Sequence, residues 1–158
     1  KGIEIEGLNV LILGAGGSAK SVIPSLLSSN PNSLSVVNRT PEKAAELVKI
    51  HKQKNPEINQ IGIDEKIHQE IDLVINSTSA STLGEELALP EGIFGPKTTS
   101  YDLSYSKEAT QFNLMAKKRG VKKTYDGLGM LINQAALSFE IWNKFKPDVK
   151  GIDLKLRS

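Results

Sequence analysis

The sequence has no cysteine, two histidines and few aromatic residues. Of its 158 residues, 5% are Phe, Trp or Tyr. Without cysteine the chain has no disulfide bond, no thiolate nucleophile and no cysteine-bound metal. His51 and His68 stand among polar residues, and we interpret both as surface residues with no catalytic role. The composition therefore excludes thiol chemistry, and we expect no metal site.

A strong charge imbalance and a long hydrophobic run are also lacking. Lys and Arg number 20 against 18 Asp and Glu, so the formal charge of +2 gives no reason to expect a nucleic acid or a membrane as partner. No hydrophobic run approaches the ~20 residues of a transmembrane helix. The first residues lack the basic and hydrophobic regions of a signal peptide. We therefore expect one cytoplasmic domain, long enough for its own core.

Strand-like and helix-like stretches alternate along the chain. The expected strands are Leu8–Leu13, Ser33–Val37, Ile58–Ile63, Ile71–Asn76, Thr99–Leu103 and Lys122–Tyr125. The pattern is weakest in the third of these. The expected helices begin near Gly16, at Pro41 after an N-cap Thr40, at Lys107 (ending at Arg119, before Gly120) and at Leu128. This alternation predicts an α/β fold, with a doubly wound parallel sheet and helices on both faces.

The most informative stretch is the glycine turn after the first strand. Gly14 lets the chain turn sharply, Gly16 presents no side chain to an approaching pyrophosphate, and Ala19 lets the new helix pack close to the sheet. The helix start directs N–H groups and a positive dipole end toward an anion. An ordinary strand-to-helix turn is the alternative. The strand before it and the helix after it favour a Rossmann-type dinucleotide site.

The residues after the second strand indicate which dinucleotide binds. An NAD site usually has Asp or Glu about 20 residues after the glycine turn, whereas this chain has Asn38, Arg39 and Thr40. Arg39 can pair with the 2′-phosphate of NADP, Asn38 and Thr40 offer hydrogen bonds, and Lys43 adds a second positive charge. The alternative is that Arg39 is a solvated loop residue and Thr40 only a helix cap. We favour NADP as the cofactor.

Five motifs occur in the order seen in shikimate dehydrogenases, and the chain resembles that family along nearly its whole length. The motifs are Gly14–Ala19, Asn38–Thr40, Asn76–Ser79, Tyr101–Tyr105 and Asp126–Ala135. The last is the most distinctive. The resemblance implies NADP-dependent, reversible reduction of 3-dehydroshikimate to shikimate, in the biosynthesis of chorismate and aromatic amino acids. Other two-domain NADP oxidoreductases explain the last motif less well.

Two positions depart from the family pattern. Ser81 stands where the family commonly has Gly, and Ser106-Lys107 stands where a Pro often follows the second tyrosine. Both changes affect the shapes of loops. They leave a quinate dehydrogenase-like specificity open.

The resemblance also implies roles for residues that spacing alone does not single out. Asn76–Ser79 would lie near the nicotinamide ribose, Gly127, Gly129 and Met130 would border the nicotinamide, and Tyr105 and Gln134 would reach the substrate. By its position alone Gln134 reads as an exposed glutamine. The full set of expected cofactor-binding residues is Gly14, Ala15, Gly16, Gly17, Ser18, Ala19, Asn38, Arg39, Thr40, Lys43, Asn76, Ser77, Thr78, Ser79, Leu103, Gly127, Gly129 and Met130.

No residue of this chain is assigned as the proton donor. Lys20 is interpreted as a surface or phosphate-side charge, Tyr101 can equally be a core residue, and Asp102 and Asp126 are expected to orient loops rather than transfer protons. The resemblance implies that a separate N-terminal domain binds the substrate and supplies the proton. We therefore interpret residues 1–158 as the NADP-binding domain with a C-terminal helical tail, able to bind NADP with little or no activity alone. A regulatory or scaffold module that binds a nucleotide is the alternative.

The C-terminal third carries hydrophobic residues that this domain has no evident means to cover. They lie on the helix from Leu128 and in the tail Ile152–Leu156. In the complete enzyme we expect them to help join the two domains. In this chain they predict self-association into a homodimer.

Overall fold

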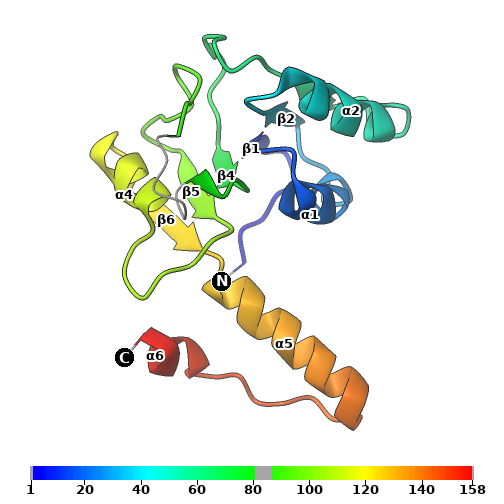
Figure 1. Ribbon diagram of the computed structural model, residues 1–158, viewed down its shortest axis with the longest axis vertical. Helices are drawn as coiled ribbons and strands as arrows, with labels where there is room; N and C mark the ends of the chain where they lie inside the picture. Colours follow the sequence, from blue (N-terminus) through cyan, green and yellow to red (C-terminus); the bar gives the residue numbers. More distant parts are fainter. Residues whose placement is uncertain (1, 81–86, 158) are drawn as a thin grey trace.

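The computed structural model describes residues 2–80 and 87–157, which form one six-stranded parallel sheet flanked by helices (Figure 1). The spatial order of the strands is β3-β2-β1-β4-β5-β6. This is the order of a doubly wound sheet made of two βαβαβ halves. The strands are β1 Asn9–Leu13, β2 Ser33–Val37, β3 Ile58–Gln60, β4 Leu73–Asn76, β5 Thr99–Asp102 and β6 Lys123–Asp126.

The two halves meet where β1 pairs with β4. Val10 is in register with Leu73 there, while on its other side β1 pairs with β2, with Leu13 opposite Val37. The chain therefore reverses its winding direction at the carboxyl ends of β1 and β4. Sheets of this kind bind ligands in the crevice at such a reversal.

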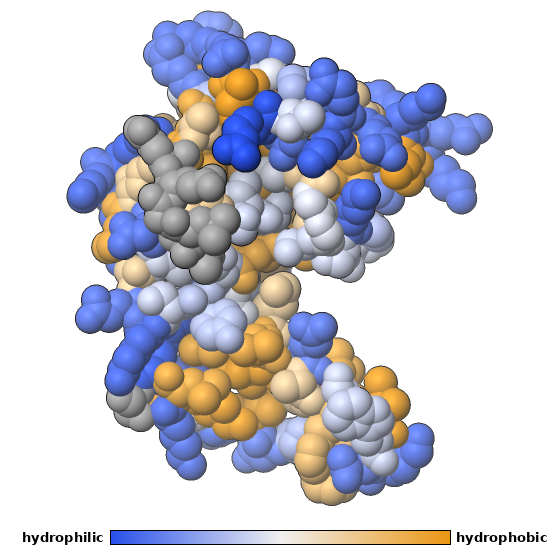
Figure 2. Space-filling model, viewed as in Figure 1, coloured by the Kyte–Doolittle hydropathy of each residue, from blue (hydrophilic) through white to orange (hydrophobic). Residues whose placement is uncertain are grey.

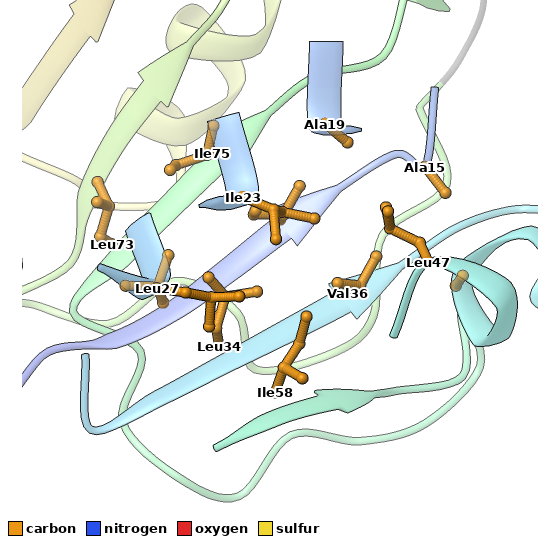
Figure 3. Close-up of a cluster of buried hydrophobic side chains, with 13 residues drawn as sticks. Ala15, Ala19, Ile23, Leu27, Leu34, Val36, Leu47, Ile58, Leu73 and Ile75 are labelled. Atoms are coloured by element: carbon orange, nitrogen blue, oxygen red, sulfur yellow. The ribbon is translucent and has the colours of Figure 1, made fainter. Parts of the chain in front are cut away.

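Successive residues of the central strands enter two different cores. On one face Val10 and Ile12 pack with residues of α1 (Gly17–Leu27) and α2 (Pro41–Lys52). Figure 3 shows this cluster, with Ala19, Ile23 and Leu27 of α1 lying over the strands. On the other face Leu11 and Leu13 pack with Phe112 of α4 (Gln111–Lys118) and with residues of the connecting segments. Burial on both faces explains why these strands are continuously hydrophobic rather than alternating.

Three of the expected boundaries differ from the observed ones by two residues or more, and several others differ by one. The third strand ends at Gln60, not Ile63, and the fourth begins at Leu73, not Ile71. The third expected helix begins at Gln111 rather than Lys107, because the Thr110 hydroxyl accepts a hydrogen bond from the Asn113 N–H and caps the helix there.

The last helix of the expected set, α5 (Leu128–Asn143), extends away from the sheet (Figure 1). Only Leu128 and Ile132 are buried among its described residues. It ends at Lys144, whose left-handed backbone (φ 60°) terminates the helix. The tail, expected to be helical but without stated bounds, then forms a further helix, α6 (Ile152–Arg157).

Much of the hydrophobic surface of α5 and the tail is exposed. Figure 2 shows hydrophobic residues gathered over the lower half of the molecule, where Figure 1 places α5 and α6. Trp142 is 79% exposed, Leu154 72% and Ile141 63%. The expected uncovered surface is therefore present. Among the described residues, no helix combines the length and hydrophobicity needed to cross a membrane.

Candidate functional site

A cavity of about 590 Å³ opens at the carboxyl ends of β1, β2 and β4. It lies at the reversal point of the sheet, where a ligand site is expected. Eleven of the residues that the sequence singled out for the cofactor line it: Gly14, Ala15, Gly16, Gly17, Asn38, Arg39, Thr40, Lys43, Ser77, Thr78 and Ser79. Segments far apart in the sequence are thus brought together around one space.

Gly14 makes the turn from β1 into α1. Its φ is +105°, a conformation that residues with a side chain rarely adopt. A Cβ placed on Gly14 would stand 2.6 Å from Ser77 Oγ and 3.1 Å from Thr78 Cγ2. The turn can therefore pass this close to the end of β4 only with glycine.

Gly16 and Gly17 face open space. A Cβ on either would meet no atom within 4 Å. α1 begins here, with Gly16 as its N-cap and no side chain capping it. Because the first N–H groups of a helix have no partner within the helix, they are available to an anion. The shape and the donor set of this cradle fit a pyrophosphate.

The rim of the cavity is positively charged. The side chains of Lys20, Arg39 and Lys43 contribute three positive charges, and Glu46 contributes one negative charge. Glu46, which no sequence motif singled out, lines the cavity from the second turn of α2. The balance favours a ligand that carries more than one negative charge.

The loop carrying Arg39 is held by Asn38. The Asn38 side-chain oxygen accepts a hydrogen bond from the Ala15 N–H (3.2 Å), and its amide donates to the Thr40 carbonyl (2.8 Å). Asn38 thus ties the end of β2 to the glycine turn. Thr40 is the N-cap residue of α2, as expected, but its side chain makes no capping hydrogen bond.

A chain of polar contacts links the carboxyl ends of β4 and β5. The Asn76 amide donates to Asp102 Oδ1 (3.0 Å), and Asn76 Oδ1 accepts from the hydroxyl of Thr78 (2.7 Å). Asp102 Oδ1 also accepts from the Ser104 N–H (3.1 Å). Asn76 and Asp102 are fully buried, so they shape the loops from below rather than lining the cavity.

Asp102 is an unusual carboxyl group, because its second oxygen, Oδ2, is buried with no hydrogen-bond partner among the described residues. Burial raises the pKa of Asp102 above its ordinary value, and the nearby Asp126 carboxylate adds to the rise. The Thr110 hydroxyl, the Ser104 N–H and the Asn76 amide oppose it. The expectation that Asp102 orients loops agrees with this geometry.

The remaining expected site residues lie outside the first cavity. Ser18 is exposed, and Ala19 is buried on the face of α1 that packs against the sheet. Gly129 and Met130 line a second cavity, also of about 590 Å³, between β5, β6, the start of α5 and α6. Leu103 and Gly127 pack against one another, and a Cβ on Gly127 would stand 2.0 Å from the Leu103 carbonyl oxygen.

The two expected substrate residues line neither cavity. Tyr105 is 55% exposed and Gln134 is exposed on α5. Ser81, one of the two departures from the family pattern, lies outside the described residues. Among the described residues, 2–80 and 87–157, no group of three or more His, Asp or Glu side chains could hold a metal ion.

The sheet order, the glycine turn and the positively charged cavity define a doubly wound, Rossmann-type domain. The sequence model of the shikimate / quinate 5-dehydrogenases matches residues 1–86, and that of the shikimate 5′-dehydrogenase C-terminal domain matches residues 127–152. The chain belongs to the shikimate / quinate 5-dehydrogenase family.

Individual relatives agree with this assignment. The chain is 43% identical over 155 residues to the shikimate dehydrogenase (NADP(+)) of Vibrio campbellii, which covers 98% of this chain and 55% of that protein. The structure matches an Ael1 enzyme from Pseudomonas putida (TM-score 0.86, 30% identity, 97% of this chain and 56% of the other). It also matches shikimate 5-dehydrogenase from Listeria monocytogenes (TM-score 0.79, 25% identity, 96% and 56%). The chain spans about half the length of the curated relatives it matches.

Proposed function

We propose that this chain is the NADP-binding domain of a shikimate dehydrogenase, an enzyme that reversibly reduces 3-dehydroshikimate to shikimate with NADPH. The names of the curated relatives and the match along 98% of this chain support the reaction. Since those relatives are nearly twice as long, we assign proton donation, and the substrate contacts beyond those of Tyr105 and Gln134, to the other half of the protein.

The observation that carries the choice of NADP is the position of Arg39. It stands on the rim of the first cavity, at the end of β2, where an NAD site usually has a carboxylate. A carboxylate there would repel a 2′-phosphate, whereas a guanidinium can bind one in a bidentate manner. Lys43, one turn into α2, also lines this side of the cavity.

Each part of the site has a separate task in this proposal. The N–H groups at the start of α1 bind the pyrophosphate, and Gly16 and Gly17 leave room for it. Arg39 binds the 2′-phosphate, and Asn38 holds the loop in place. NADPH, when bound, supplies the hydride. The segments 103–105 and 127–130 would orient the nicotinamide and the substrate.

Calorimetric titration of this chain with NADPH and with NADH tests the proposal. We expect NADPH to bind at least tenfold more tightly, a difference of about 1.4 kcal/mol. Equal affinities would remove the 2′-phosphate from the recognition. No binding of either cofactor would argue against a preformed site in this chain.

Reconstitution tests the activity. The chain is mixed with a separately produced N-terminal half of a related enzyme, and NADP-dependent oxidation of shikimate and of quinate is followed. Restored turnover of shikimate supports the proposal, and preferential turnover of quinate would identify a quinate dehydrogenase. A nucleotide-binding scaffold would restore neither.

Two further parts of the proposal concern the setting of the chain. We propose a cytoplasmic location, in line with the cysteine-free sequence. We also propose that this chain alone forms a homodimer through the exposed hydrophobic residues of α5, because nothing among the described residues covers Ile141 and Trp142.

A further inference from the structure

One guanidinium group joins three separate segments in the half of the sheet that does not carry the glycine turn. Arg157, at the end of α6, binds both carboxylate oxygens of Asp126, at 2.7 Å (Oδ1) and 2.6 Å (Oδ2). Its other terminal nitrogen donates to the Ser106 carbonyl over 2.7 Å. The contacts connect the C-terminal helix with the end of β6 and with the loop after β5.

Asp126 passes this constraint to the start of α5. Its Oδ1 also accepts a hydrogen bond from the Leu128 N–H (3.3 Å), and the Gly127 N–H donates to the Ser104 carbonyl (2.9 Å). A Cβ on Gly127 would stand 2.0 Å from the Leu103 carbonyl oxygen, so the two loops already touch. These contacts therefore hold the loop after β5 against the turn from β6 into α5, and Arg157 contacts both of them.

These contacts lie where the second nucleotide of a bound dinucleotide is expected. The carboxyl ends of β5 and β6 belong to the half of the sheet that does not carry the glycine turn. A dinucleotide that crosses the reversal point places its second nucleotide over that half. Gly129 and Met130, together with Asp126 and Arg157, line the second cavity there.

We propose that Arg157 is a positioning residue for the nicotinamide half of the cofactor: through Asp126 it fixes the turn at residues 126–130 against the loop at residues 103–106. The inference rests on the proposed function, because it takes NADP as the ligand. Arg157 acts at a distance and makes no contact with the adenosine half, since it lies outside the first cavity.

The ion pair of Arg157 and Asp126 is partly shielded from solvent. The Asp126 side chain is 11% exposed and that of Arg157 is 34% exposed, so solvent screens this contact less than it screens a surface ion pair. One guanidinium nitrogen contacts both Asp126 oxygens while the other donates to the Ser106 carbonyl, an arrangement that the single nitrogen of a lysine cannot reproduce. Without Arg157 the nearly buried Asp126 carboxylate would lose its positive partner, and the turn would have to move to solvate it.

The test compares two ligands on the same variants. NADP⁺ reaches both halves of the sheet, whereas 2′,5′-ADP carries only the adenosine half with its 2′-phosphate. We expect Arg157→Gln to weaken NADP⁺ by about fivefold to tenfold in calorimetry, and to leave the affinity for 2′,5′-ADP within about twofold. We expect the NADP⁺ affinity of Arg157→Lys to lie between those of Arg157→Gln and the unaltered chain. Lys150→Gln removes a positive charge from the same exposed tail and should bind both ligands as the unaltered chain does.

A second readout reports on the nicotinamide itself. With NADPH at saturating concentration, the fluorescence anisotropy of the reduced ring should be lower on Arg157→Gln than on the unaltered chain. Asp126→Asn keeps the oxygen that accepts from Leu128 and should produce the same changes, with the double variant no worse than either single one.

Each other outcome has a definite meaning. If Arg157→Gln weakens both ligands equally, or neither, the positioning role is overturned. The same holds if the unaltered chain binds 2′,5′-ADP as tightly as NADP⁺, because the nicotinamide half would then contribute nothing. If the unaltered chain binds neither ligand, the proposed function itself fails.

Discussion

The side-chain amide of Asn76 donates a hydrogen bond to Asp102 across the carboxyl ends of β4 and β5, over 3.0 Å. Both residues are fully buried, and Asp102 Oδ2 has no hydrogen-bond partner in the part of the chain that the structure describes. The contact joins two loops that we assign to the cofactor site. It also places a carboxyl group where ionisation is costly.

This cost predicts a dependence of stability on pH. Because burial raises the pKa of Asp102, the folded state keeps a proton that the unfolded state has already lost just above pH ~3.8. The contribution of Asp102 to the free energy of unfolding therefore falls as the pH rises from that value through the raised pKa, and then stays constant. Asp102→Asn, which is isosteric, should remove this slope and be relatively more stable at neutral than at acidic pH.

Urea unfolding between pH 4 and 8 measures the effect of Asp102→Asn. Asp64→Asn, at an exposed carboxyl, serves as the control and should not reproduce the change. If the free energies of the Asp102 variant and the unaltered chain run parallel across this range, Asp102 is already ionised throughout.

Arg39→Asp should separate the two cofactors. It replaces attraction by repulsion at the 2′-phosphate, so we expect NADPH binding to lose at least tenfold more affinity than NADH binding, about 1.4 kcal/mol. Calorimetry measures both affinities. Lys49→Asp makes a comparable change in charge on the exposed surface of α2 and should affect the two cofactors alike. Equal losses on Arg39→Asp would show that Arg39 does not contact the 2′-phosphate.

Gly14→Ala should destabilise the fold. The new Cβ would stand 2.6 Å from Ser77 Oγ, and the backbone at φ +105° is strained for alanine. We expect a loss of roughly 1–3 kcal/mol in the free energy of unfolding. Gly17→Ala is the matched control, because its Cβ meets nothing within 4 Å and alanine favours a helix. A Gly14 variant as stable as the Gly17 variant would contradict the geometry of the turn.

Ile141→Lys should weaken self-association of this chain. Sedimentation velocity over a range of concentrations is expected to show a dimer that Ile141→Lys shifts toward monomer. Ile50→Lys is a close control, since Ile50 and Ile141 are both 63% exposed but lie on different helices. A strictly monomeric parent chain at high concentration, or equal effects of both substitutions, would rule out α5 as the contact surface.

The sequence predicted the sheet well, because the central strands are buried on both faces and leave an unbroken hydrophobic pattern. It placed the start of α4 four residues too early, since the capping role of Thr110 depends on its backbone conformation rather than on composition. It indicated a helical tail but gave no bounds for α6, whose hydrophobic residues Ile152, Leu154 and Leu156 stand at alternate positions rather than at helical spacing.

The same distinction between local and long-range features applies to the residues of the site. The glycine turn and Arg39 could be found because they are local features, close in sequence to the strands that position them. The Asp102 and Arg157 contacts could not, because they depend on long-range packing. Arg157 meets Asp126 from 31 residues away, and no local pattern indicates that pairing.

The pairing of β1 with β4 also governs how the chain folds. Every pairing inside each half joins strands that follow one another in the sequence, but Val10 must find Leu73 across the whole of α1, β2, α2 and β3. Closing so long a loop is entropically costly, so we expect the seam to form late. Gly14 and Ser77 stand on either side of that seam, and the first cavity, which residues of both halves line, is therefore complete only once the seam has formed. A dinucleotide bound in this cavity would contact both halves of the sheet and would therefore slow their separation.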